Sequence, residues 1–254
     1  MFRRRIHLIV SVAVLFLIVF AGSMLAQSGT DKVRLFQSYF LDAPIAKTNH
    51  VQPGLSYATS KQEFMGKSFS VNTLMLGANG GYAVNEKLEI LGGLNYISIS
   101  SDGEGEGGLS DLAVYARYAL SDQKETQISA GGLLTLPIGS EDIGQGALNF
   151  GGYSAIRHHL DGGIVITGNL ALIFYEAGDD RNTSMEISTG LIYPMDNKIN
   201  LVGEFVIKSE FDQMMLSAGA DYDMGNGRVR GALGLGLDDG SPDFQIMAGY
   251  LMAL

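Results

Sequence analysis

Apolar residues at every second position limit the fold of this 254-residue sequence more than any other feature does. Between residues 227 and 238, Val229, Leu233 and Leu235 alternate with Arg228 and Arg230. Successive side chains of a β-strand point to opposite faces, so a period of two predicts a strand with one apolar face. Residues 111–120 repeat the pattern, and no helical period fits them as well. The sequence therefore predicts an all-β fold.

Twelve segments of this kind follow one another along the chain. Each has at least nine residues, and a tilted strand needs about 9–11 residues to cross a bilayer. The predicted strands are residues 51–59, 68–82, 87–99, 108–120, 124–137, 146–157, 163–176, 182–194, 198–208, 212–224, 227–238 and 243–254.

The connections between these segments alternate in length and charge. Short, turn-like segments are residues 85–87, 121–124, 158–161, 195–198 and 225–227. Longer and more acidic segments are residues 101–107, 139–146, 178–182 and 238–243. Short turns at one rim and longer loops at the other are typical of an up-and-down outer-membrane β-barrel. A soluble β-sandwich is the alternative, but it would not favour this asymmetry.

The first 26 residues have the composition of a cleavable signal peptide. Three arginines at positions 3–5 precede the apolar stretch 6–21, and small residues follow near position 23. An uncleaved anchor helix is the alternative. The remainder has no apolar run of the ~18 residues that a spanning helix needs, so an exported membrane protein must be a closed barrel. We expect residues 27–50 to form a periplasmic or plug-like segment and residues 51–254 to form an outer-membrane barrel.

Composition excludes several classes of function. The chain has no Cys, which rules out disulfides and thiolate metal sites. It has 17 basic and 27 acidic residues, so a nucleic-acid partner is not expected. Its 34 glycines are nearly twice the usual ~7%, which suits a strongly coiled sheet around a crowded lumen.

Four segments resemble a family of outer-membrane barrels labelled "MetA-pathway of phenol degradation" or "transporter". They are Gly108-Leu109-Ser110-Asp111-Leu112 with Tyr115-Ala116-Arg117-Tyr118, Leu134-Thr135-Leu136-Pro137-Ile138-Gly139, Tyr193-Pro194 with Leu201-Val202-Gly203-Glu204, and Asp238-Asp239-Gly240-Ser241-Pro242-Asp243-Phe244-Gln245. The resemblance covers about residues 70–254. It implies a barrel that admits small, often aromatic, molecules and no enzyme. It also implies insertion by the barrel-assembly machinery through the C-terminal strand, where Met252 and Leu254 replace the usual aromatic residues.

Catalytic and metal-binding residues are scarce. Outside the predicted signal peptide the only histidines are His50, His158 and His159, and two adjacent imidazoles point to opposite faces of a strand. We therefore expect no catalytic residue, no cofactor and no metal. The acidic segments 101–107 and 238–243 could bind Ca²⁺, but a hydrated loop surface is the simpler interpretation.

Charged residues at inward positions are the candidate functional residues. A charge facing lipid near the bilayer midplane costs up to about 2–4 kcal/mol, so these residues are assigned to the lumen. The predicted lumen or constriction residues are Tyr115, Arg117, Arg157, Glu186, Glu204, Asp221, Arg228 and Arg230. They could pair with one another and fill the barrel, or they could form a charged constriction that selects solutes. Tyr153 and Tyr175 share the inward side.

Aromatic residues near the strand ends suit the girdles at the two membrane interfaces. These residues are Tyr118, Phe174, Tyr193, Tyr222, Phe244 and Tyr250. The sequence thus predicts a monomeric barrel, surrounded by outer-membrane lipid, for passive diffusion of a small-molecule solute. The alternatives are a closed structural or surface-interaction barrel and a soluble secreted β-protein.

Overall fold

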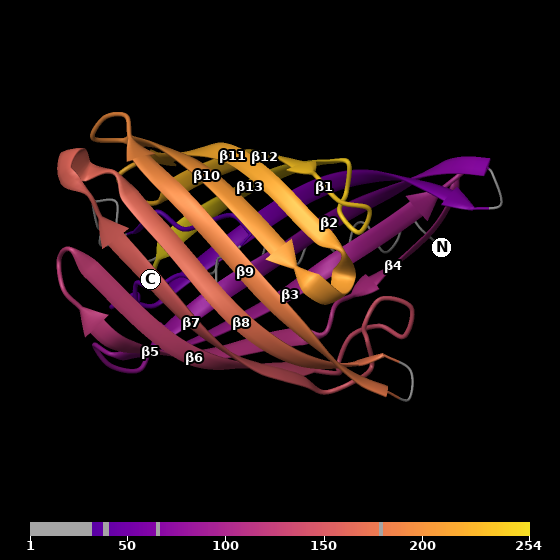
Figure 1. Ribbon diagram of the computed structural model, residues 1–254, viewed down its shortest axis with the longest axis horizontal. Helices are drawn as coiled ribbons and strands as arrows, with labels where there is room; N and C mark the ends of the chain where they lie inside the picture. Colours follow the sequence, from indigo (N-terminus) through magenta and orange to yellow (C-terminus); the bar gives the residue numbers. More distant parts are fainter. Residues whose placement is uncertain (1–31, 38–40, 65–66, 178–179) are drawn as a thin grey trace.

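Strands account for nearly all of the regular structure in the computed structural model, which describes residues 32–37, 41–64, 67–177 and 180–254 (Figure 1). The predicted signal peptide and residues 27–31 lie outside the described residues. The strands are β1 (His50–Phe64), β2 (Lys67–Ala83), β3 (Leu88–Ser101), β4 (Glu104–Leu109), β5 (Leu112–Asp122), β6 (Thr126–Leu136), β7 (Asn149–His159), β8 (Val165–Ala177), β9 (Asp180–Pro194), β10 (Ile199–Lys208), β11 (Gln213–Asp223), β12 (Arg228–Gly236) and β13 (Phe244–Ala253). No helix among these described ranges is long and apolar enough to span a membrane.

The sheet closes on itself. Strands that follow one another in the chain pair antiparallel, except β4 and β5, and β1 pairs with β13, for example Tyr57 with Ile246. The strands run diagonally around a cylinder whose long axis is horizontal in Figure 1. Because β4 and β5 both pair with β3, they occupy one place in the wall, and the wall contains twelve strands. This confirms the predicted twelve-strand antiparallel barrel.

One predicted strand and one predicted loop are wrong in detail. The predicted strand 108–120 is interrupted at Ser110 and Asp111. Gly93 of β3 pairs with Ala113, and Tyr96 of β3 pairs with Leu109. Between these two pairs the chain that faces β3 therefore has one residue more than β3 has. The segment 101–107 is not a loop but a hairpin. Asp102 and Gly103 have φ values of 50° and 88° and form the tight turn, so the acidic residues that follow extend the ladder as β4.

Short turns and both ends of the barrel lie at one rim, which we call the turn rim. His50 pairs with Ala253 there, and the turns after β2, β5, β7, β9 and β11 lie on the same side. Asp196 shows how such a turn is fixed: its Oδ1 accepts hydrogen bonds from the main-chain N–H groups of Lys198 and Ile199, both at 2.7 Å. These bonds hold the pKa of Asp196 below its usual range. The opposite end, called the loop rim, carries the longest connection, residues 137–148.

Side chains alternate between the two faces of the wall as the sequence predicts. In β12, Leu233 and Leu235 are 54% and 51% exposed, whereas Arg228 and Arg230 are 4% and 2% exposed. Of the predicted girdle residues, Tyr118, Phe174, Tyr193 and Tyr222 are among the exposed large residues of the outer face. Phe244 and Tyr250 are only half-buried. The barrel therefore presents an apolar exterior and a charged interior.

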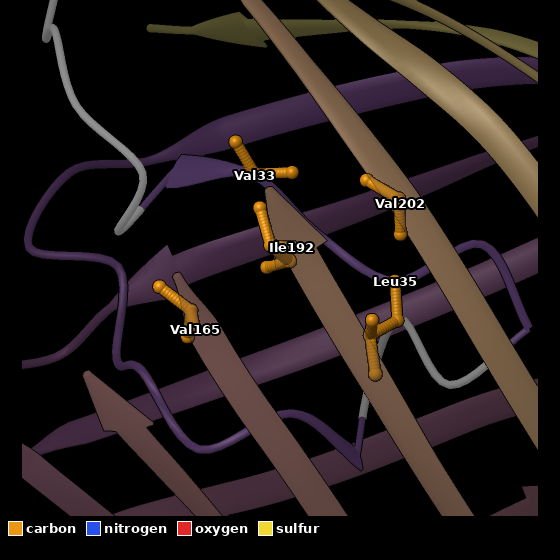
Figure 2. Close-up of a cluster of buried hydrophobic side chains, with 5 residues drawn as sticks. All are labelled: Val33, Leu35, Val165, Ile192 and Val202. Atoms are coloured by element: carbon orange, nitrogen blue, oxygen red, sulfur yellow. The ribbon is translucent and has the colours of Figure 1, made fainter. Parts of the chain in front are cut away.

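The described part of the chain before β1 lies inside the barrel. We call its described residues, 32–37 and 41–49, the N-terminal segment. Val33 and Leu35 pack against the inward side chains of Val165, Ile192 and Val202, and all five are at most 2% exposed. Figure 2 shows the two residues of the segment lying over the strands that carry the other three. This cluster is the apolar core of the interior and joins the segment to β8, β9 and β10.

Candidate functional site in the barrel interior

Most of the predicted lumen residues are buried inside the barrel. Arg117, Arg157, Glu204, Asp221, Arg228 and Arg230 are between 0% and 4% exposed. The Glu186 side chain is 12% exposed and its Oε1 lies 3.6 Å from Lys208 Nζ. Tyr115 is half-buried, while Tyr153 and Tyr175 are 6% and 7% exposed. The strands place all of these side chains on the face opposite the exposed apolar one, which brings the charges together.

The first ionic cluster joins β3 and β5 to the N-terminal segment. Arg117 Nη2 donates to Glu89 Oε2, and both side chains are at most 1% exposed. The second guanidinium nitrogen, Nη1, donates to the main-chain oxygen of Asp42 at 2.6 Å. Glu89 Oε2 also accepts from the N–H of Ala46 at 3.2 Å. A fixed pair on the wall thus binds two main-chain groups of the segment.

The second cluster is centred on Asp42. Arg157 Nη2 donates to Asp42 Oδ2 and, at 2.8 Å, to the main-chain oxygen of Val33. Asp42 Oδ1 accepts from the N–H of Ala43 at 2.8 Å and from Thr167 Oγ1 at 3.3 Å. Both ionic side chains have an exposed fraction of 0%. Asp42 is therefore the main charged contact from the segment to the wall.

The third cluster lies on β11 and β12. Asp221 pairs with Arg228 through Oδ1 and with Arg230 through Oδ2, the latter at 3.2 Å, and Arg228 Nη1 reaches Asp223 at 2.9 Å. Arg230 also donates to the main-chain oxygen of Arg34. Its guanidinium carbon lies 4.5 Å from the ring centroid of Phe36, a cation–π contact.

Glu204 holds the same part of the N-terminal segment from β10. Its Oε2 accepts from the N–H groups of Phe36 at 3.1 Å and Gln37 at 2.9 Å. A carboxylate that accepts two main-chain N–H groups fixes the course of the chain, because both donors would otherwise be buried without an acceptor. Thus every predicted lumen charge pairs with another charge, with the N-terminal segment, or with both.

Sequence reasoning missed Glu89 and Asp42. Glu89 could have been found, because it lies between Leu88 and Ile90 in a predicted strand. The predicted lumen charges alternate with apolar residues in the same way. Asp42 gave no such signal, since the segment around it has no period of two. Its role is visible only from the contacts with the wall.

Two cavities among the described residues are lined partly by the N-terminal segment. The first has a volume of about 340 Å³, opens toward the turn rim, and is lined by residues that include Lys32, Arg34 and Arg228. The second has a volume of about 360 Å³, lies toward the loop rim, and is lined by residues that include Phe36 and Gln37. The cavities have no lining residue in common. The N-terminal segment therefore contributes residues to two separate linings.

Two of the family-like motifs fix loops at the loop rim. Asp111 Oδ1 accepts from the N–H of Gly139 at 2.9 Å, and its Oδ2 accepts from the N–H of Gln145 at 2.8 Å. Asp111 thus holds the loop 139–146, which begins where the motif Leu134–Gly139 ends. In the closing motif, Ser241 Oγ accepts from the N–H of Met214 and donates to its main-chain oxygen, both at 2.8 Å. These two motifs stabilise loops, and Pro242 and Gln245 of the closing motif also line the second cavity.

Two of the described histidines contact polar side chains near the turn rim. His158 Nδ1 lies 2.8 Å from Thr126 Oγ1 in an exposed pair near the turn rim. His50 Nδ1 lies 3.5 Å from Glu89 Oε1. Within the described ranges no three His, Asp or Glu side chains are gathered as a metal site requires.

Several solved structures share the fold. A COG4313 outer membrane channel from Pseudomonas putida F1 has 16% identity and a TM-score of 0.66, and the match covers 88% of this chain and 100% of the other. A KdgM porin in complex with disordered oligogalacturonate has 10% identity and a TM-score of 0.54, covering 81% and 99%. The translocator domain of the autotransporter NalP from Neisseria meningitidis has 12% identity and a TM-score of 0.51, covering 85% and 92%. At such identities the likeness shows the fold alone.

The family is established by sequence. No curated protein matches the chain. Residues 53–253, however, match the sequence pattern of a family described as "Putative MetA-pathway of phenol degradation". The matched range spans nearly the whole barrel wall and includes the motifs that fix its loops. The chain therefore belongs to this family of outer-membrane barrels.

Proposed function

We propose that this protein is a monomeric outer-membrane channel through which small solutes diffuse passively. The observation that carries the proposal is the pair of cavities, about 340 and 360 Å³, inside a closed barrel with an apolar exterior. Both cavities are partly open, so a small solute can enter them. Solutes would pass between the N-terminal segment and the wall, where ion pairs make the route narrow.

The proposal includes a location and an orientation. Residues 1–26 direct export, and the barrel-assembly machinery inserts the barrel into lipid through β13. Both ends of the barrel lie at the turn rim, so this rim faces the periplasm. The family description refers to phenol degradation, which favours small aromatic molecules among the solutes.

A closed structural or surface-interaction barrel is the second candidate. The observation that favours it is the packing inside the barrel, where the Val33 cluster and the Asp42 cluster bind the N-terminal segment to the wall. In that case the N-terminal segment would be a permanent filling of the lumen.

Planar bilayer recording and liposome swelling with the purified full chain distinguish the two candidates. A channel gives discrete conductance and admits solutes, and Arg228→Gln shifts the conductance because Arg228 lines the cavity at the turn rim. Arg181→Gln is the matched control, since Arg181 is 40% exposed at the loop rim. Electrically silent protein that admits no solute would contradict the channel and support the closed barrel.

A further inference from the structure

The cavity toward the loop rim, about 360 Å³, has a lining unlike the ionic interior around it. We call it the amide cavity, because six carboxamide side chains line it. They are Gln37, Gln52, Asn79, Asn95, Gln213 and Gln245. A carboxamide offers two N–H donors and a carbonyl acceptor, so this lining can both donate to and accept from a bound molecule.

The lining has almost no charge to offer. Lys208 is its one charged residue among the described ranges, and its Nζ lies 3.6 Å from Glu186 Oε1. An anion entering the cavity would meet a cation that already has a carboxylate nearby, and a cation would meet no carboxylate in the lining. Moving an ion from water into such a site is costly without a partner. The lining therefore offers a cation no carboxylate, and it offers an anion only a lysine that already lies beside Glu186.

Apolar side chains complete the cavity. Met75, Met215 and Met247 come from three different strands, and Phe36 comes from the N-terminal segment. Met215 and Met247 are 2% and 9% exposed. Thioethers are flexible and polarisable and make favourable contacts with rings, so this side of the cavity suits a flat or compact apolar skeleton.

Two details describe the carboxamides around the cavity. Gln37 Nε2 is shielded from solvent and has no hydrogen-bond partner among the described residues. The Asn95 side chain lies over Gly77, its pairing partner on β2, where any Cβ atom would overlap the carboxamide. Gly77 thus leaves the space that the Asn95 carboxamide occupies, and both residues line the cavity.

We propose that the amide cavity binds small uncharged solutes that carry hydroxyl, carbonyl or amide groups on an apolar skeleton. Its volume is near the lower end of the ~300–1,000 Å³ range of small-molecule sites, which excludes large ligands. This inference rests on the proposed function and adds to it the class of solute. A ligand in the cavity would contact the N-terminal segment through Phe36 and Gln37.

Three probes of similar size and different charge test the inference. Benzamide, benzoate and benzylammonium are titrated against the purified full chain in detergent, and binding is measured by equilibrium dialysis at neutral pH. We expect benzamide to bind, and we expect the affinity of each ion to be lower by a factor of about ten or more. Equal binding of the three, preference for either ion, or no binding of benzamide would overturn the proposal.

Variants locate the binding. Gln213→Glu adds a carboxylate to the lining without changing the size of the side chain and should weaken benzamide binding about fivefold or more. Gln123→Glu makes the same change in an exposed turn and should leave binding unchanged. Gly77→Ala, which displaces the Asn95 carboxamide, should weaken binding without adding charge. Heat-dependent migration in gel electrophoresis shows whether each barrel is folded, and unchanged binding in both cavity variants would refute the site.

Binding and transport can fail separately. Conductance without benzamide binding would leave the channel standing and remove the site. Benzamide binding that depends on Gln213, in a protein that admits no solute into liposomes, would support the site and contradict the channel.

Discussion

Removal of the Asp42 carboxylate should release the N-terminal segment while leaving the wall intact. In Asp42→Ala, Arg157 keeps its bond to the Val33 main chain but loses the buried carboxylate that balances its charge. Breaking a buried ion pair by removing one partner costs about 3–5 kcal/mol. This cost should fall on docking of the segment, because the wall is held by main-chain pairing that includes no atom of Asp42. The docking equilibrium should therefore shift by roughly two to four powers of ten.

Hydrogen exchange measured by mass spectrometry tests this magnitude. In the unaltered protein the N–H groups of Phe36, Gln37 and Ala46 are bonded to wall carboxylates, so peptides from the segment should exchange slowly. Asp42→Ala should accelerate the exchange of these peptides by roughly two to four powers of ten, up to full loss of protection. Peptides from β8 and β12 serve as the internal control and should not change. Exchange of the segment within about threefold of the unaltered protein would refute the reasoning.

A matched aspartate separates buried charge from charge in general. Asp122 also pairs with the segment, through Lys47 at 2.9 Å, but the two side chains are 41% and 58% exposed. Exposed pairs contribute about 0–1 kcal/mol, so Asp122→Ala should change exchange less than about fivefold. The double variant Asp42→Ala/Arg157→Met should recover part of the lost protection, because it leaves no buried charge without its partner.

Three further outcomes are expected. Glu204→Ala should accelerate hydrogen exchange of the two main-chain N–H groups that Glu204 binds. Leaving a buried N–H group without an acceptor costs about 1–3 kcal/mol. Exchange in the strands should not change. Asp111→Ala should open the loop 139–146 to limited proteolysis without altering the melting temperature of the barrel, since this carboxylate binds two N–H groups of that loop. Leu233→Arg, on the outer face of β12, should lower the free energy of unfolding by about 2–4 kcal/mol, measured by urea titration in vesicles. Val229→Arg, near the turn rim, should lower it by only about 0–1 kcal/mol. Equal losses would contradict a membrane-spanning wall.

The wall of the barrel was predictable because its constraint is local. A strand with one apolar face shows its period within ten residues, as the alternation of Leu233 and Leu235 with Arg230 does. The same rule gave the inward position of most of the buried charges. It would also have given Glu89, had it been applied to every predicted strand.

The break between β4 and β5 could not be read from the alternation. It depends on Asp111, whose carboxylate binds Gly139 and Gln145 in a loop that is distant in sequence. The bulge at Ser110 and Asp111 brings that carboxylate to the loop. Alternation within one strand does not indicate a contact with a loop that is distant in sequence. Motif resemblance identified Asp111 and Gly139 but not the contact between them.

The N-terminal segment was unpredictable in conformation for a physical reason that also explains how it is held. The wall binds it largely through main-chain atoms: Arg157 contacts the oxygen of Val33, Arg117 contacts that of Asp42, and Glu204 accepts two of its N–H groups. Main-chain groups are the same in every residue, so recognition of this kind leaves little trace in the sequence. Side-chain identity matters mainly for the two buried apolar residues, Val33 and Leu35, and for the Asp42 carboxylate. The charges needed to hold the segment are therefore carried by the wall, where the period of two makes them visible.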